Sequence, residues 1–456
     1  MEDATIESTP PELVNPSVVC PVCEGFAHGG LLPLQQLPDH LREIVSSNAA
    51  SANADEVCRR CVELFSRAQR QSESHAAVFE QNDFVLPTPL RMGADQRFTG
   101  RGVTIAFLDS GFYAHTDLTT PRNRIRAYHS IFAAEGDQTS LETADVASWH
   151  GMMTSVVAAG NGALSDGFYR GIASEADVVL VKIGRTGRIS EDQIRQGLEW
   201  VLARAEEYQI RVVNISAGGD FEESYLSNPL SQTVERCTRA GLTVVCAVGN
   251  AGHVPGHPVL PPASAPSCIA VGGLDDQNST DRARRGMYRS SYGPTIDGLQ
   301  KPELIAPGIW VAAPILPSTP TAEEAELYSQ LNGVADEELL AAIDQHAGID
   351  RDLDEARSLR IPLLRQLITI KLREGNVISR HYKYVDGTSF AAPIVSSIVA
   401  CMLEANPRLT PPQIKRILID TAERVPEIEV DRQGWGVVAA ARAVASALGQ
   451  NPDESG

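Results

Sequence analysis

The chain has 456 residues, 43% of them hydrophobic, and its 58 acidic and 39 basic side chains give a formal net charge of −19. Because a chain with this net negative charge repels phosphate backbones and anionic lipids, we expect neither nucleic acid nor a membrane as its main partner. We expect no apolar run long enough to span a bilayer, and the first residues lack the basic and apolar regions of a signal peptide. A cytoplasmic protein is therefore predicted.

Residues 1–80 differ from the rest in cysteine use and helix pattern, so we predict an N-terminal cysteine-rich module there. Its cysteines form two C-x-x-C pairs: Cys20, Cys23, Cys58 and Cys61. Four thiolates so paired can surround zinc tetrahedrally, and we predict a structural zinc site, with His28 and His40 as substitute ligands. Unliganded thiols or disulfides are the alternatives. Residues 53–71 are predicted to form a helix that carries the second pair.

Residues 81–447 are predicted to form the main domain, and 448–456 a tail. Strands are expected within 103–111, 176–184, 210–219, 242–252 and 268–273, and helices within 149–162, 190–209 and 230–241. Near-continuous Val/Ile runs that alternate with amphipathic helices are typical of a parallel sheet covered on both faces. The sequence therefore predicts an α/β fold of three layers.

Residues 317–378 interrupt this alternation and are predicted to form a helical insertion. Helices are expected within 321–331, 335–346 and 352–375, the last interrupted by Pro362. Residues 321–360 hold 11 acidic and 3 basic side chains. A solvated acidic decoration is the simpler interpretation; a lid, or a docking site for a regulator or a substrate, is the sharper one.

Polar residues follow three of the predicted strands and begin two of the predicted helices. Asp109, Ser216 and Asn250 come at strand ends. His150 begins the helix within 149–162, and Ser389 begins a long apolar helix pattern within 384–407. Singly, each has a simple explanation as a turn or cap residue. Together they supply what nucleophilic catalysis requires, namely a hydroxyl, a base, an orienting carboxylate and an oxyanion donor.

Small residues crowd Ser389 in the sequence GTSFAAP, where they leave room for a substrate backbone. The start of a helix would also place the Ser389 hydroxyl near the positive end of the helix dipole. We expect Pro393 in the first helical turn, where a missing N–H costs little.

The order of the motifs IAFLDSGFYAHTDL, WHGMMTSVVAAG, VVCAVGNAG, PPASAPSCIAVGG, KPELIAPG and GTSFAAP resembles that of the subtilisin-like serine proteases. The resemblance covers roughly residues 102–440 apart from the insertion. It implies a subtilisin-like fold with Asp109 as orienting carboxylate, His150 as general base and Ser389 as nucleophile. Asn250 and the Ser389 N–H would form the oxyanion hole. His115 matches a structural histidine of the family.

The resemblance also implies where a substrate would lie. Ser216, Ala217 and Gly218 match the edge segment that pairs with an extended peptide, and Ala247 and Gly249 face it across the first specificity pocket.

Two features depart from the family pattern. Met152 replaces the usual threonine after His-Gly, with Thr154 two residues on, and no family pro-domain is recognisable in residues 1–80.

We therefore predict a serine endopeptidase that cleaves proteins or peptides and is regulated by its N-terminal module or its insertion. A peptide ligase or macrocyclase with the same triad and an inactive binding scaffold are the alternatives. Zinc is the only predicted cofactor, because the residues alone do not define a calcium site.

Overall fold

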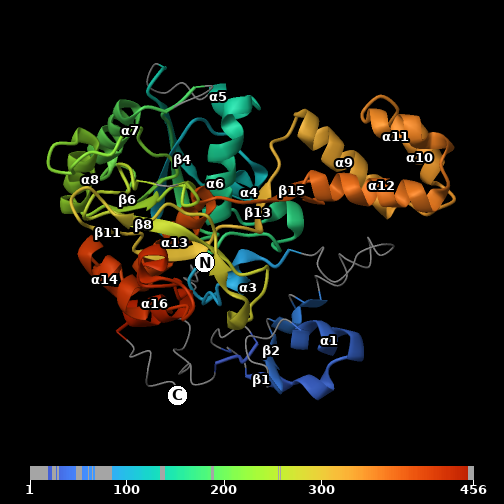
Figure 1. Ribbon diagram of the computed structural model, residues 1–456, viewed down its shortest axis with the longest axis horizontal. Coiled ribbons are helices and arrows are strands. Elements are labelled where there is room, and N and C mark those ends of the chain that lie inside the picture. The colour runs from blue at the N-terminus through green and yellow to red at the C-terminus, as the bar shows by residue number, and fades with distance from the viewer. Residues whose placement is uncertain are drawn as a thin grey trace, which may run out of the picture.

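A mostly parallel sheet forms the centre of the protein (Figure 1). The computed structural model describes residues 19–22, 27, 30–47, 54–59, 61–63, 65–66, 85–133, 139–185, 189–254, 256 and 258–449. In spatial order the parallel strands are β12 (Leu304–Pro307), β8 (Ile269–Asp275), β7 (Thr243–Ala247), β6 (Ile210–Ile215), β3 (Thr104–Asp109), β5 (Asp177–Lys182) and β4 (Ile125–Ser130). The short β9 (Gly286–Met287) adds to β8 in antiparallel direction. The predicted sheet is thus confirmed.

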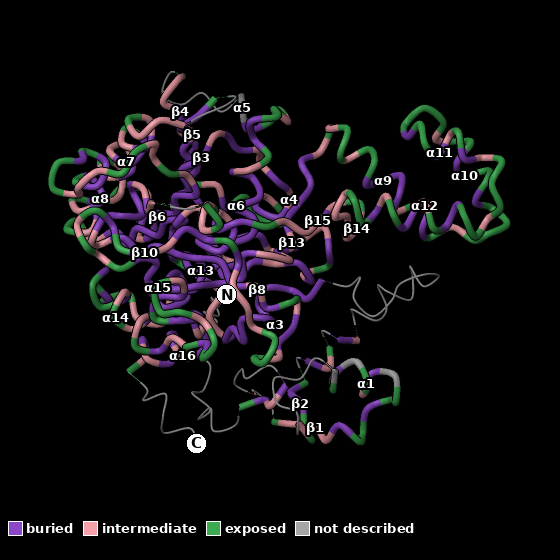
Figure 2. Tube along the Cα trace, viewed as in Figure 1, coloured by how far each residue is buried: buried purple, intermediate pink, exposed green. Residues whose placement is uncertain are grey.

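Helices cover both faces of this sheet and give three layers. One face packs against α6 (Trp149–Ala159), α13 (Thr388–Ala405) and α16 (Ala440–Ala447), and the other against α7 (Glu191–Arg204) and α8 (Pro229–Arg239). Strand β3 shows how alternation divides the core. Ile105 and Phe107 join the α6 and α13 side, whereas Ala106 and Leu108 join the α7 and α8 side. Figure 2 shows the buried sheet between the two layers.

Local sequence signals explain where several elements begin. Helix α7 starts after Ser190, whose side chain accepts a hydrogen bond from the Gln193 N–H while the Gln193 side chain accepts one from the Ser190 N–H. This capping box satisfies two backbone donors that have no partner within the helix. The two edge strands β4 and β12 were not predicted, because β4 mixes polar residues such as Arg126 and His129 into its run and β12 is short.

Helix α13 corrects the expectation that no segment has membrane-spanning length. Its 18 residues are long and apolar enough to cross a bilayer. However, 83% of that stretch is buried inside the protein, where it packs on α6 and the sheet. A helix buried between the sheet and neighbouring helices is apolar all round, as a membrane helix is, because none of its faces meets water.

The insertion is a helical lobe that projects from the main body (Figure 1). Its helices are α9 (Pro320–Gly333), α10 (Leu339–Gln345), α11 (Arg351–Glu355) and α12 (Ile361–Glu374). The third predicted helix is thus divided into α11 and α12, and Pro362 lies in the first turn of α12. Leu331, Leu339, Leu353 and Leu364 belong to a core cluster of its own. A separate sheet joins the lobe to the body: β13 (Val311–Pro314) and β14 (Val377–Ser379) flank β15 (Tyr382–Val385).

The N-terminal module contains α1 (Asp39–Ser47) and an antiparallel pair, β1 (Leu31–Pro33) and β2 (Glu56–Cys58). The predicted helix over 53–71 is therefore wrong at its start. Cys58 ends a strand, because Val57 and Cys58 pair with β1, and the described residues from 59 to 66 are helical. Cross-strand pairing overrides the helical pattern of this short segment.

Candidate active site

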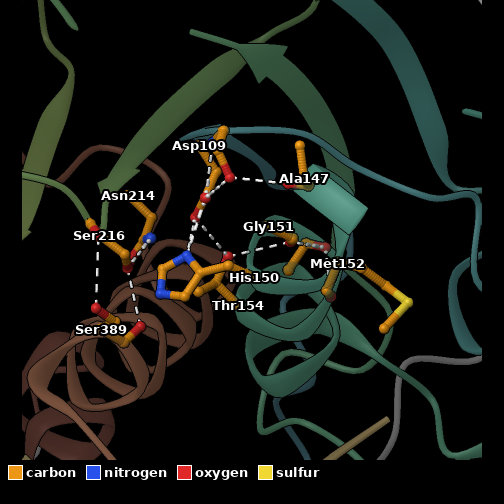
Figure 3. Close-up of polar contacts among 11 residues, drawn as sticks. Asp109, Ala147, His150, Gly151, Met152, Thr154, Asn214, Ser216 and Ser389 are labelled. Atoms are coloured by element: carbon orange, nitrogen blue, oxygen red, sulfur yellow. Dashed lines mark hydrogen bonds and ion pairs between the residues drawn. The ribbon is translucent and has the colours of Figure 1, made fainter. Parts of the chain in front are cut away.

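The carboxyl ends of three neighbouring strands bring the predicted polar residues together. Asp109 is the last residue of β3, Ser216 follows β6, and Asn250 lies shortly after β7. Because β7, β6 and β3 are adjacent and parallel, these ends lie along one edge of the sheet. His150 in the first turn of α6 and Ser389 in the first turn of α13 face the same edge (Figure 3).

Asp109 and His150 are in direct contact. Both carboxylate oxygens of Asp109 lie 2.9 Å from His150 Nδ1, and the carboxylate is nearly inaccessible to solvent. The Ser110 N–H donates to the same carboxylate at 2.7 Å, and the Thr154 hydroxyl approaches it at 3.4 Å. A Cβ at Gly151 would lie 2.1 Å from a backbone oxygen, so only glycine lets α6 approach this closely.

The environment of His150 favours proton uptake by the imidazole. Burial lowers its pKa, but the negative charge of Asp109 and its hydrogen bond act in the opposite direction. The net result is a pKa of His150 above the ordinary 6.5. With Nδ1 donating to Asp109, the unprotonated nitrogen is Nε2, and this nitrogen faces Ser389 in Figure 3.

The Ser389 hydroxyl does not hydrogen-bond to His150 in this structure, and both residues are among those described. It donates instead to the Ser216 carbonyl at 3.4 Å, while the Ser216 hydroxyl donates to the Ser389 carbonyl at 2.9 Å. The Ser216 hydroxyl is held in turn by the Asn214 amide at 3.1 Å. Reciprocal bonds therefore fix the nucleophile candidate to the end of β6.

Pro393 corrects one expectation about this helix. Because α13 begins at Thr388, Pro393 is the sixth residue and lies beyond the first turn. The N–H that proline lacks would have bonded to the carbonyl four residues earlier, which is that of Ser389. This carbonyl is therefore left for the Ser216 hydroxyl. The proline thus has a structural consequence at the site.

Asn250 is held in an orientation that leaves its amide NH₂ available. Its Oδ1 accepts hydrogen bonds from the Thr388 N–H at 2.9 Å and from the Thr388 hydroxyl at 3.0 Å. The Nδ2 atom makes no hydrogen bond within the described part of the chain. Gly249 has a φ of +105°, and a Cβ there would approach the Ser291 hydroxyl to 2.9 Å, so glycine is required at this turn.

The segments predicted to bind a substrate border the same sheet edge. Ser216 is buried, Ala217 is partly exposed and Gly218 is exposed. The Gly219 N–H donates to the Pro261 carbonyl at 2.7 Å, which holds the end of this segment in place. Ala247, the last residue of β7, is buried.

Some residues around the site escaped sequence reasoning. Thr388 sits beside Ser389 in GTSFAAP, but only its contact with Asn250 reveals its place. Trp149 packs edge-on against His150 with ring centroids 5.2 Å apart and remains 44% exposed, so it forms an apolar wall beside the imidazole. Two residues named from the sequence lie outside the site. Met152 is buried in the core, and His115 is the N-cap of α4 (Thr116–Thr119), where its side chain accepts a hydrogen bond from the Asp117 N–H.

A separate group of potential metal ligands lies in the N-terminal module. The sulfur atoms of Cys20, Cys58 and Cys61 are within 4.8 Å of one another. Cys23 and His28 fall outside the described residues, and the side chain of His40 is not described.

The model of the subtilase family, peptidase S8, matches residues 100–436. Serine protease AprX of Bacillus subtilis (strain 168) is 29% identical over 357 residues, which are 76% of this chain and 67% of AprX. Subtilisin BL of Lederbergia lenta is 31% identical over 238 residues, 52% of this chain and 72% of that protein.

A solved structure agrees in fold. The CspB protease of Clostridium perfringens superimposes with a TM-score of 0.55 at 16% identity, covering 77% of this chain and 94% of that one. The family match extends over most of the chain and includes every strand of the central sheet described above. On these grounds the chain belongs to the subtilase family of serine proteases.

Proposed function

We propose that this subtilase is an endopeptidase whose catalytic groups are Asp109, His150, Ser389 and Asn250. The observation that carries the proposal is the paired 2.9 Å contact of Asp109 with His150 Nδ1, which turns Nε2 toward Ser389. A serine hydroxyl is a weak nucleophile until a positioned base accepts its proton. The raised pKa of His150 makes its imidazole a stronger base for this step.

The proposed reaction proceeds through an acyl-enzyme. A rotation of the Ser389 side chain exchanges the 3.4 Å bond to the Ser216 carbonyl for one to His150 Nε2. The Ser389 oxygen then attacks the peptide carbonyl carbon as its proton moves to His150. The Asn250 amide and the Ser389 N–H stabilise the oxyanion. His150 passes the proton to the departing amine. Water, deprotonated by His150, then attacks the acyl carbon, and the bond to the Ser389 oxygen breaks as His150 returns the proton to that oxygen and the acid leaves.

The substrate is proposed to lie extended along residues 216–218. This segment follows β6 and is partly open to solvent, so its main chain can pair with a peptide strand. Ala247 and Gly249 lie at the end of the neighbouring strand and would border the side chain that precedes the cleaved bond. The small size of both residues favours an apolar side chain that fills the space.

We further propose that the enzyme acts in the cytoplasm and that the lobe regulates its choice of substrate. The lobe is joined through β15, which ends at Val385 shortly before Ser389, and the Gly387 N–H bonds to the Gly308 carbonyl at 2.7 Å. A partner bound to the lobe could thus alter the segment that carries the nucleophile. The described cysteines of the main domain are buried and form no disulfide, which supports a reducing, cytoplasmic setting.

A fluorophosphonate probe tests the assignment of the nucleophile. The unaltered protein should be labelled, and Ser389→Ala should not, while Ser216→Ala, with the neighbouring hydroxyl removed, should keep labelling. Equal labelling of Ser389→Ala would refute the assignment. Mass spectrometry of the products of a linear peptide separates hydrolysis, which adds the mass of one water, from ligation or cyclisation, which does not.

A further inference from the structure

The N-terminal module gathers three cysteines from two distant segments around one point. Cys20 precedes β1, Cys58 ends β2, and Cys61 lies in the helical residues that follow. All three are buried, with exposures of 0%, 3% and 0%. Their sulfur atoms lie within 4.8 Å of one another, and those of Cys20 and Cys61 are 4.0 Å apart.

These separations match metal coordination and not disulfide bonding. Four thiolates at about 2.3 Å from a tetrahedral zinc ion lie about 3.8 Å from one another. Sulfur atoms joined in a disulfide are only about 2.05 Å apart. The 4.0 Å between the Cys20 and Cys61 sulfurs therefore fits two ligands of one ion.

Backbone N–H groups also point at the sulfur atoms. The Cys58 N–H donates to Cys20 Sγ at 3.2 Å, and the Cys61 N–H donates to Cys58 Sγ at 3.5 Å. Such donors stabilise negative charge on sulfur and orient metal ligands. A neutral thiol packed among apolar side chains has little need of them.

We propose that Cys20, Cys58 and Cys61 bind one zinc ion; Cys23, the fourth ligand predicted from the sequence, lies outside the described residues. Cys23 stands in the C-x-x-C spacing with Cys20 that Cys61 has with Cys58. Thiolate ligands without an open position give a closed, structural site. The ion does not take part in peptide hydrolysis.

The ion would hold a small module together and onto the main domain. Among the described residues its core is one cluster that includes the three cysteines, and modules of this size commonly need a metal or disulfides to fold. That core includes Leu86 and Leu90, from the segment that enters the main domain. Leu90 lies in α3 (Thr88–Arg91), and the buried Arg91 side chain pairs with Asp276. Zinc is thus proposed to join residues 20–61 to the body through α3.

The test uses the full chain carrying Ser389→Ala, so that self-cleavage cannot remove the module. Protein purified without chelators should contain about one zinc per chain by mass spectrometry of the metal. Cys20→Ser, Cys58→Ser and Cys61→Ser should each lose most of it, as should Cys23→Ser. Cys237→Ala is the matched control, since this buried cysteine lies in α8 of the main domain, and it should keep the ion.

Two measurements do not depend on the folding of the cysteine variants. Replacing zinc by Co²⁺ in the Ser389→Ala protein should give the thiolate charge-transfer and intense d–d absorption of a tetrahedral sulfur site. A mercurial reagent titrated against the zinc protein should release the ion as four thiols react. Three results would each overturn the proposal: folded protein that contains no metal, a cobalt spectrum typical of octahedral coordination, or fewer titratable thiols in the denatured, unreduced chain than its 8 cysteines. Because probe labelling of Ser389 is measured separately, failure here leaves the proposed catalytic function untouched.

Discussion

The Thr388 hydroxyl offers a sensitive test of how the oxyanion donor is held. It donates to Asn250 Oδ1 at 3.0 Å, beside the Thr388 N–H bond at 2.9 Å, and accepts the Gly249 N–H at 3.3 Å. Thr388→Val keeps the shape of the side chain and removes only the hydroxyl. The Asn250 amide then keeps one of its two anchors.

We expect Thr388→Val to lower kcat modestly. One neutral hydrogen bond contributes about 1 kcal/mol, which corresponds to a roughly fivefold lower kcat if it acts only in the transition state. KM should change little, because the oxyanion forms only during the reaction. Asn250→Ala removes the donor itself, and its kcat should fall about 100- to 1,000-fold, the loss known for the oxyanion asparagine of subtilisin.

Steady-state kinetics on a chromogenic peptide would measure both effects. Thr388→Ser keeps the hydroxyl and should retain most of the activity. In an Asn250→Ala background, Thr388→Val should cause no further loss, because its effect passes through the missing amide. A fivefold loss that persists in that background, or an effect confined to KM, would refute the reasoning.

Three further predictions concern the base, a buried ion pair and the lobe. Because only unprotonated His150 accepts a proton, kcat/KM should rise with pH through a midpoint above 6.5. Asp109→Asn should lower both this midpoint and the plateau of kcat/KM. An unmoved midpoint would contradict the pairing of Asp109 with His150. Arg91→Met leaves Asp276, only 5% exposed, without its charged partner and should cost about 3–5 kcal/mol in urea unfolding, with Arg91→Met/Asp276→Leu recovering part of it. Residues 317–375 connect β13 to β14, which lie on either side of β15 and so are about 10 Å apart. A Gly-Ser linker of about six residues should therefore replace them without unfolding the sheet. Probe labelling of Ser389 should persist while the cleavage profile on whole proteins changes; an unchanged profile would exclude the lobe from substrate choice.

Much of the architecture follows from the sequence alone, because the signals are local and strong. Buried parallel strands such as Thr104–Asp109 are nearly continuous apolar runs, and helix starts such as Ser190 carry their own caps. The order of short motifs around Asp109, His150 and Ser389 indicates the protease family before any contact is known. The insertion is recognisable in the same way, since its composition departs from the alternation around it.

Other features depend on contacts between distant residues, which no local pattern encodes. The start of α13 at Thr388 decides which carbonyl Pro393 leaves unpaired, and the order of β6 and β3 brings the Ser216 hydroxyl to it. Cys58 lies in a strand only because Leu31 pairs with it across the module. Sequence thus determined the kinds of groups and their order along the chain. Tertiary structure decided their distances and partners, because strand adjacency and helix start points are fixed by packing across the whole domain.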